Sequence, residues 1–91
     1  MKVTWTSKAV GDLVRLHDFL APVNQGAAAR VLQSLAKVAG RLTDQPRIGE
    51  KLDRYDPREV RRVLVGRYEV RYEVRALDVI ILRVWPTRED R

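Results

Sequence analysis

The sequence predicts an α+β fold in the order β-α-α-β-β-β, with an antiparallel twisted sheet packed on a two-helix hairpin. Three observations lead to this fold class. Apolar residues recur at helical spacing through the first half of the chain, and strict alternation replaces that period after Glu59. An irregular segment that contains Pro46, Gly49 and Pro57 separates the two halves. With 91 residues, we expect a single domain, residues 1–91, with a modest core.

The first half predicts a short strand followed by two helices. Val3–Trp5 alternates apolar and polar residues as a strand does. Ser7 is the expected N-cap of a helix over residues 8–21, which Pro22 ends because it disfavours helical geometry before it. Asn24 is the expected cap of a second helix, whose apolar stripe comprises Ala28, Val31, Leu32, Leu35, Ala39 and Leu42. The short connection predicts an antiparallel helical hairpin.

The second half predicts a long loop and a three-stranded meander. The loop covers residues 43–57 and contains a short strand or turn at Lys51–Leu52. Three strands follow at residues 60–65, 68–75 and 79–85, and the last is expected to lie centrally because it is the most apolar. The first strand of the chain is expected to join an edge of this sheet.

Alternation assigns each strand residue to one face of the sheet. The residues expected to cover the helices are Tyr68, Val70, Tyr72 and Val74, together with Ile80, Leu82 and Val84. The opposite, open face is then expected to carry Glu69, Arg71, Glu73, Arg75, Val79, Ile81, Arg83 and Trp85, with Arg61 or Arg62. Apolar residues ringed by arginine are typical of an interface, although a solvated face with cross-strand ion pairs is the simpler alternative.

The charge pattern indicates an acidic macromolecular partner. The net charge is +6, and the 18 basic residues include four lysines, Lys2, Lys8, Lys37 and Lys51, so arginine dominates. Arginine favours planar, bidentate recognition of carboxylate or phosphate. The partner is therefore a nucleic acid or a protein with an acidic segment, unless the arginine excess reflects compositional bias alone.

Several classes of site are not expected. There is no cysteine, the single histidine, His17, lacks a neighbouring ligand, and the glycines are scattered, so we expect no metal site, no phosphate-binding loop and no cofactor. No apolar run is long enough to cross a membrane and the first residues lack a secretory pattern, so a cytoplasmic location is expected.

One reaction needs none of these groups, namely cleavage of RNA through its own 2′-hydroxyl. It requires cations, a base and an acid. Arg61, Arg71 and Arg83 could supply the cations, with Arg62 and Lys51 nearby in the sequence, and Glu59 or Glu50 could supply the base. The segment after the last strand offers no tyrosine, histidine or lysine as the acid, so this pattern is weak evidence for a nuclease.

The ordered set of motifs resembles the ParE/RelE superfamily of type II toxin–antitoxin systems over nearly the whole chain. The residues that carry the resemblance are Val3-Thr4-Trp5 with Ala9 and Asp12-Leu13, Asn24 with Ala27-Ala28-Ala29-Arg30, Leu42 with Pro46-Arg47-Ile48-Gly49, Arg58-Glu59 with Arg61-Arg62, Tyr68-Glu69-Val70-Arg71-Tyr72, and Ile81-Leu82-Arg83-Val84-Trp85 with Arg88-Glu89-Asp90.

The resemblance implies a toxin that a cognate ParD-like antitoxin neutralises. Pro86-Thr87 stands where many RelE-like relatives carry a histidine, so the chain is more similar to ParE-like inhibitors of DNA gyrase, which have no catalysis of their own. The alternatives are a RelE-like ribosome-dependent mRNA endonuclease and a harmless antitoxin partner or nucleic-acid binder. Sequence-specific nucleic-acid binding by the toxin alone is not expected. The partner-binding residues implied are Arg61, Arg62, Arg71, Arg75, Ile81, Arg83, Trp85 and Arg88.

Overall fold

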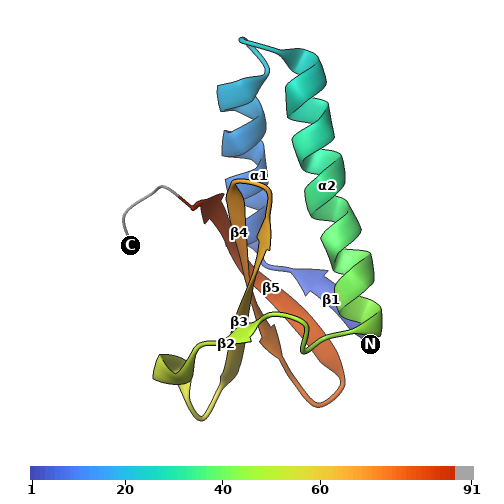
Figure 1. Cartoon of the computed structure of the whole chain (residues 1–91), viewed down its shortest axis with the longest axis vertical. Coiled ribbons are helices and arrows are strands. Elements are labelled where there is room, and N and C mark those ends of the chain that lie inside the picture. The colour runs from blue at the N-terminus through green and yellow to red at the C-terminus, as the bar shows by residue number, and fades with distance from the viewer. Residues whose placement is uncertain (88–91) are drawn as a thin grey trace.

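A helical hairpin lies against a twisted five-stranded sheet (Figure 1). The structure is a computed structural model and describes residues 1–87. The elements in chain order are β1 (Lys2–Trp5), α1 (Ser7–Leu20), α2 (Gln25–Asp44), β2 (Glu50–Lys51), the 3₁₀ helix η1 (Asp53–Tyr55), β3 (Glu59–Val65), β4 (Tyr68–Val74) and β5 (Asp78–Pro86). The predicted α+β class and the β-α-α-β-β-β order are confirmed, with β2 and η1 formed inside the predicted loop.

Both helices begin at a side-chain cap. The Asn24 side chain accepts a hydrogen bond from the Ala27 N–H, as predicted. The cap of α1 is Thr6 and not Ser7, because the Thr6 hydroxyl oxygen accepts from the Ala9 N–H while Ser7 is already helical. The Thr6 hydroxyl also donates to the Leu82 carbonyl of β5, so this cap ties the start of α1 to the sheet.

The sheet has the strand order β1-β5-β4-β3-β2 and is mixed. Strands β2 to β5 pair antiparallel and β1 lies at an edge, as predicted, but β1 runs parallel to β5. A strand separated from its partner by two helices carries no turn that would fix its direction. Strand β5 lies inside the sheet, with a neighbouring strand on each side. The middle strand of the five is β4, whereas the sequence had predicted a central position for β5.

The predicted helix-facing side of β4 is confirmed. Val70, Tyr72 and Val74 lie in the core with Leu35 and Leu42 of α2. Tyr72 is fully buried and its hydroxyl oxygen accepts a hydrogen bond of 2.9 Å from the Gly49 N–H, which anchors the start of β2 to the centre of the sheet.

The faces predicted for the first half of β5 were wrong. Val79 and Ile81 are fully buried in the core, although both were expected on the open face. The register explains the error, since Arg71 pairs with Arg83 while Tyr72 pairs with Ile81, so Leu82 is an extra residue at a β-bulge. Alternation reverses across that extra residue, which leaves the second half of β5 with the predicted faces.

Alanine substitutions at two glycines are expected to change the stability of the fold in opposite directions. A Cβ on Gly49 would lie 2.7 Å from the Tyr72 hydroxyl and closer still to the Arg62 carbonyl, whereas a Cβ on Gly40, within α2, would meet nothing within 4 Å. We expect Gly49→Ala to destabilise the fold by about 3 kcal/mol through overpacking, and Gly40→Ala to stabilise it by about 0.5–1 kcal/mol through helix propensity. Urea unfolding of both variants tests this, and an equal effect of the two would contradict the packing of Gly49.

In the part of the chain that the structure describes, neither helix is both long and apolar enough to cross a membrane.

Candidate partner-binding site

Three arginines lie in one row across the open face, the face of the sheet opposite the helices. Arg62 of β3 pairs with Arg71 of β4, and Arg71 pairs with Arg83 of β5. Paired residues on neighbouring strands point to the same face. Three guanidinium groups therefore lie close together, and positive charges at such separations need anionic partners.

Buried Glu69 supplies one of these partners. Its side chain is 1% exposed, and it accepts a hydrogen bond from Arg71 on the same strand. Arg62 approaches the other carboxylate oxygen at 3.6 Å and also donates to Glu50 at 2.9 Å. A buried carboxylate is tolerated when charged donors surround it, so Glu69 and the arginines stabilise one another in place.

Two aromatic rings flank the central arginine. The Arg71 guanidinium lies 4.8 Å from the Trp85 ring centroid and 5.9 Å from that of Tyr55, and it donates to the Tyr55 hydroxyl at 3.0 Å. The Arg83 guanidinium also lies over the Trp85 ring, 5.1 Å from its centroid. These stacked cation–π contacts hold the planar groups rigidly. We call Tyr55, Arg62, Glu69, Arg71, Arg83 and Trp85 the arginine–tryptophan cluster.

Tyr55 has an altered acidity within this cluster. Burial raises the pKa of its hydroxyl, but the hydrogen bond and charge of Arg71, together with those of Arg54, outweigh it, so the pKa lies below its ordinary value of 10.0.

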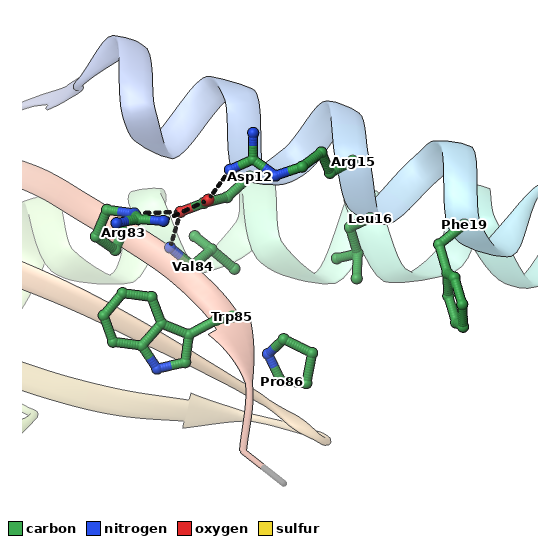
Figure 2. Close-up of a pocket in the computed structure, with 8 residues that line it drawn as sticks. All are labelled: Asp12, Arg15, Leu16, Phe19, Arg83, Val84, Trp85 and Pro86. Atoms are coloured by element: carbon green, nitrogen blue, oxygen red, sulfur yellow. Dashed lines mark hydrogen bonds and ion pairs between the residues drawn. The ribbon is translucent and has the colours of Figure 1, made fainter. Parts of the chain in front are cut away.

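Asp12 joins α1 to the cluster. Its carboxylate accepts from Arg83 through Nε at 2.9 Å and Nη2 at 3.0 Å, from the Val84 N–H at 2.8 Å, and from Arg15 one helical turn away (Figure 2). Strand β1 pairs with β5 no further than Ile81, so α1 covers the next part of that edge. Asp12 thus satisfies a backbone donor of the strand edge and fixes the orientation of Arg83.

The acidity of Asp12 predicts how stability depends on pH. Burial raises its pKa, but the hydrogen bonds from Arg83 and the Val84 N–H and the charge of Arg83 outweigh it, so the pKa lies below its ordinary value of 3.8. Because the pKa of Asp12 is lower in the folded than in the unfolded protein, its ionised carboxylate contributes stability that is fully present above pH 3.8. This contribution is lost as the pH falls through the folded-state pKa.

The expected difference in unfolding free energy between the wild type and Asp12→Asn is therefore constant above this region and narrows below pH 3.8. Urea titrations of both proteins over that range measure it. A difference that does not change with pH would contradict the ionised, hydrogen-bonded state of Asp12.

A groove of about 420 Å³ runs between α1 and the end of β5, and we call it the α1–β5 groove. Arg15, Leu16 and Phe19 line it from the helix, while Trp85 and Pro86 line it from the strand (Figure 2). Phe19 is 76% exposed, a large fraction for an aromatic side chain. An apolar groove beside a row of arginines suits a segment that has both apolar and acidic side chains.

The predicted partner-binding residues divide into two groups. Arg62, Arg71, Arg83 and Trp85 lie together in the cluster. The others do not join it within the described residues. Ile81 is buried in the core, Arg75 lies beyond the end of β4 and contacts Asp78, and Arg88 is outside the described residues. Arg61 pairs with Tyr72, so it lies on the opposite face of the sheet from Arg62.

The residues considered for RNA cleavage are divided between the two faces, although the alternative base Glu50 lies on the open face, where it accepts from Arg62 at 2.9 Å. Arg71 and Arg83 lie on the open face, whereas Arg61 and Glu59 pair with residues of the core-facing side. Glu59 accepts from Arg47 at 2.9 Å and from Arg61 at 2.8 Å, and these hydrogen bonds lower its pKa. A carboxylate held ionised by two guanidinium groups is a weak base, and it faces away from the arginine row.

Three residues of the site were missed by the sequence analysis. Asp12 had no role because its partners Arg83 and Val84 are far away in the sequence. Tyr55 lay in a segment treated as loop, although it is an aromatic residue flanked by arginines at 54 and 58. Phe19 lies outside the apolar stripe of α1, and a large apolar residue off the buried stripe is the signal that could have identified it.

Among residues 1–87, no group of three or more His, Asp or Glu side chains is arranged to hold a metal ion.

Comparisons with known proteins agree with this architecture. The model of the family described as ParE toxin of type II toxin-antitoxin system, parDE, matches residues 3–91. A solved structure of a chromosomal ParDE toxin–antitoxin system from P. aeruginosa has the same fold, with a TM-score of 0.76 and 21% identity over 94% of this chain and 95% of that one. The curated proteins gave no significant match. Because the family match spans nearly the whole chain, the protein belongs to the ParE toxin family of type II toxin–antitoxin systems.

Proposed function

We propose that this ParE-family toxin poisons DNA gyrase and that a cognate ParD-like antitoxin neutralises it by covering the arginine–tryptophan cluster and the α1–β5 groove. The observation that carries the docking part is the combination of aligned arginines, half-buried Trp85 and exposed Phe19 around one groove. Tryptophan and arginine are enriched where protein partners bind most strongly. The net charge of +6 favours association with an acidic segment.

Gyrase as the target follows from the ParE-like character of the chain and is favoured by the arrangement of the cluster. Arg62, Arg71 and Arg83 are each engaged by a carboxylate, so the row is organised as a rigid surface. The candidate nuclease residues Glu59 and Arg61 lie on the other face. A binding surface that traps an enzyme–DNA complex needs no acid or base of its own.

Purified gyrase tests this proposal. With relaxed plasmid DNA and ATP, the toxin is expected to inhibit supercoiling and to produce linear, cleaved DNA when protein is removed by denaturation and protease, and the antitoxin is expected to prevent both effects. Unchanged supercoiling and no cleavage product at saturating toxin would overturn the gyrase assignment while leaving the family assignment intact.

Tyr55 favours a second candidate, the mRNA endonuclease. A tyrosine whose pKa is lowered by Arg71 and Arg54 could serve in proton transfer beside phosphate-binding arginines. In that case Tyr55→Phe and Arg71→Ala abolish translation-dependent mRNA cleavage. If toxin induction leaves transcripts intact, this alternative fails.

A further inference from the structure

The free edge of the β3–β4 hairpin is a feature that neither the cluster nor the α1–β5 groove involves. Strand β2 pairs with Arg61 and Arg62 of β3, and in residues 1–87 no strand continues alongside residues 63–65. The Leu52 N–H donates to the Val60 carbonyl at 2.8 Å, which shows that Val60 directs its peptide groups to this side. Peptide groups alternate along a strand, so those of Leu64 point outward at the same edge. Such an edge is a template for another strand.

An apolar groove lies directly beside this edge. It has a volume of about 280 Å³ and lies between α2 and the hairpin turn. Its apolar lining is Val31 and Leu35 from α2 and Val65 and Tyr68 from the hairpin. Val65 belongs to the part of β3 that pairs with β4 but not with β2, so a strand added at the other edge would direct every second side chain into the groove.

Two arginines at this groove are available for acidic groups. Arg30 of α2 and Arg67 of the turn are exposed and line the groove, and neither forms an ion pair with the described residues. By contrast, Arg62, Arg71 and Arg83 already contact carboxylates. Within residues 1–87, the positive charge beside the free edge therefore has no acidic partner.

We propose that the edge of β3 at residues 63–65 is a docking site for an extended acidic peptide segment of a protein partner. The segment adds to the sheet as a strand, places apolar side chains in the groove and pairs its carboxylates with Arg30 and Arg67. A second copy of this chain is a poorer occupant, because edge-to-edge pairing would bring both copies' arginines together. The inference is independent of gyrase and of docking at the arginine–tryptophan cluster.

The test uses the full-length, ¹⁵N-labelled toxin and an acetylated, amidated ten-residue peptide in which valine or leucine alternates with glutamate. Titration is expected to cause saturable NMR shifts in the amides of residues 63–68 and 30–35. Hydrogen exchange of the Leu64 amide is expected to slow by about tenfold or more once it donates to the added strand.

Charge reversal separates this site from general attraction between opposite charges. Arg30→Glu with Arg67→Glu is expected to weaken peptide binding by about tenfold or more. Lys37→Glu with Arg41→Glu makes the same change of charge at exposed positions of α2 outside the groove and is expected to have little effect. A peptide with lysine in place of glutamate is expected not to bind.

Three results of the peptide experiments would overturn the proposal. They are the absence of shifts at residues 63–68 up to the solubility of the peptide, shifts confined to the Arg83–Trp85 region, and equal weakening by both double variants. Concentration-dependent shifts of the β3 edge without peptide would instead assign this edge to self-association and would also contradict it.

Discussion

Asp12→Ala is expected to lower the free energy of unfolding by about 2–3 kcal/mol, because it leaves the buried Val84 N–H unsatisfied and removes charged hydrogen bonds to the partly exposed Arg83. The Asp12 side chain is 5% exposed, and its loss removes the acceptor of the Val84 N–H and one acceptor of the Arg83 guanidinium. For a domain of this size, each kcal/mol corresponds to about 4–8 °C in the unfolding temperature. Thermal and urea unfolding followed by circular dichroism measure the effect.

Asp18→Ala is the matched control, because Asp18 lies on the same helix with its side chain 73% exposed. Its expected effect is within about 0.5 kcal/mol, as for ordinary surface substitutions. Asp12→Asn keeps the size of the side chain and is expected to fall between the two, since an amide oxygen can still accept one hydrogen bond. Similar stability of the two alanine variants would show that Asp12 does not hold α1 to β5.

Trp85→Ala is expected to weaken binding of the cognate antitoxin by about 30-fold or more, which corresponds to the 2 kcal/mol typical of an interface hot spot. Trp85 both lines the α1–β5 groove and stacks on Arg71 and Arg83, so its replacement removes apolar surface from the groove and the ring on which these two guanidinium groups stack. Isothermal titration calorimetry of the purified proteins measures the affinity.

Leu77→Ala provides the control for the loss of an exposed apolar side chain. Leu77 is 86% exposed in the β4–β5 turn, away from the groove. Its expected change in affinity is less than twofold. If Trp85→Ala bound the antitoxin as tightly as Leu77→Ala, the arginine–tryptophan cluster would not be the docking surface.

The sequence was sufficient for the two helices and for the strands of the second half because each of these has a strong local signal. The apolar stripe of α2, the Asn24 cap and the alternation of residues 68–74 all depend on residues within a few positions of one another. Gly66, with φ of 59°, likewise fits the two-residue turn between β3 and β4. Tertiary contacts do not alter the helices and strands that these local patterns predict.

The site was less predictable because it depends on distant pairings. The bulge at Leu82 cannot be seen in an unbroken apolar run, yet it decides that Ile81 is core while Arg83 and Trp85 face outward. The contact of Asp12 with Arg83 spans 71 positions. Tyr55 reaches Arg71 because the loop after α2 folds over the sheet, and no periodicity describes such a path.

Induction of the toxin without its antitoxin most directly tests its proposed action on gyrase. In one culture, a DNA-damage reporter and the integrity of several abundant transcripts are followed over the first minutes. The proposal predicts strong damage signalling while the transcripts remain full length. Cleaved transcripts without damage signalling would contradict it in favour of an mRNA endonuclease, and normal growth with neither change would show that the fold is retained without poisoning activity.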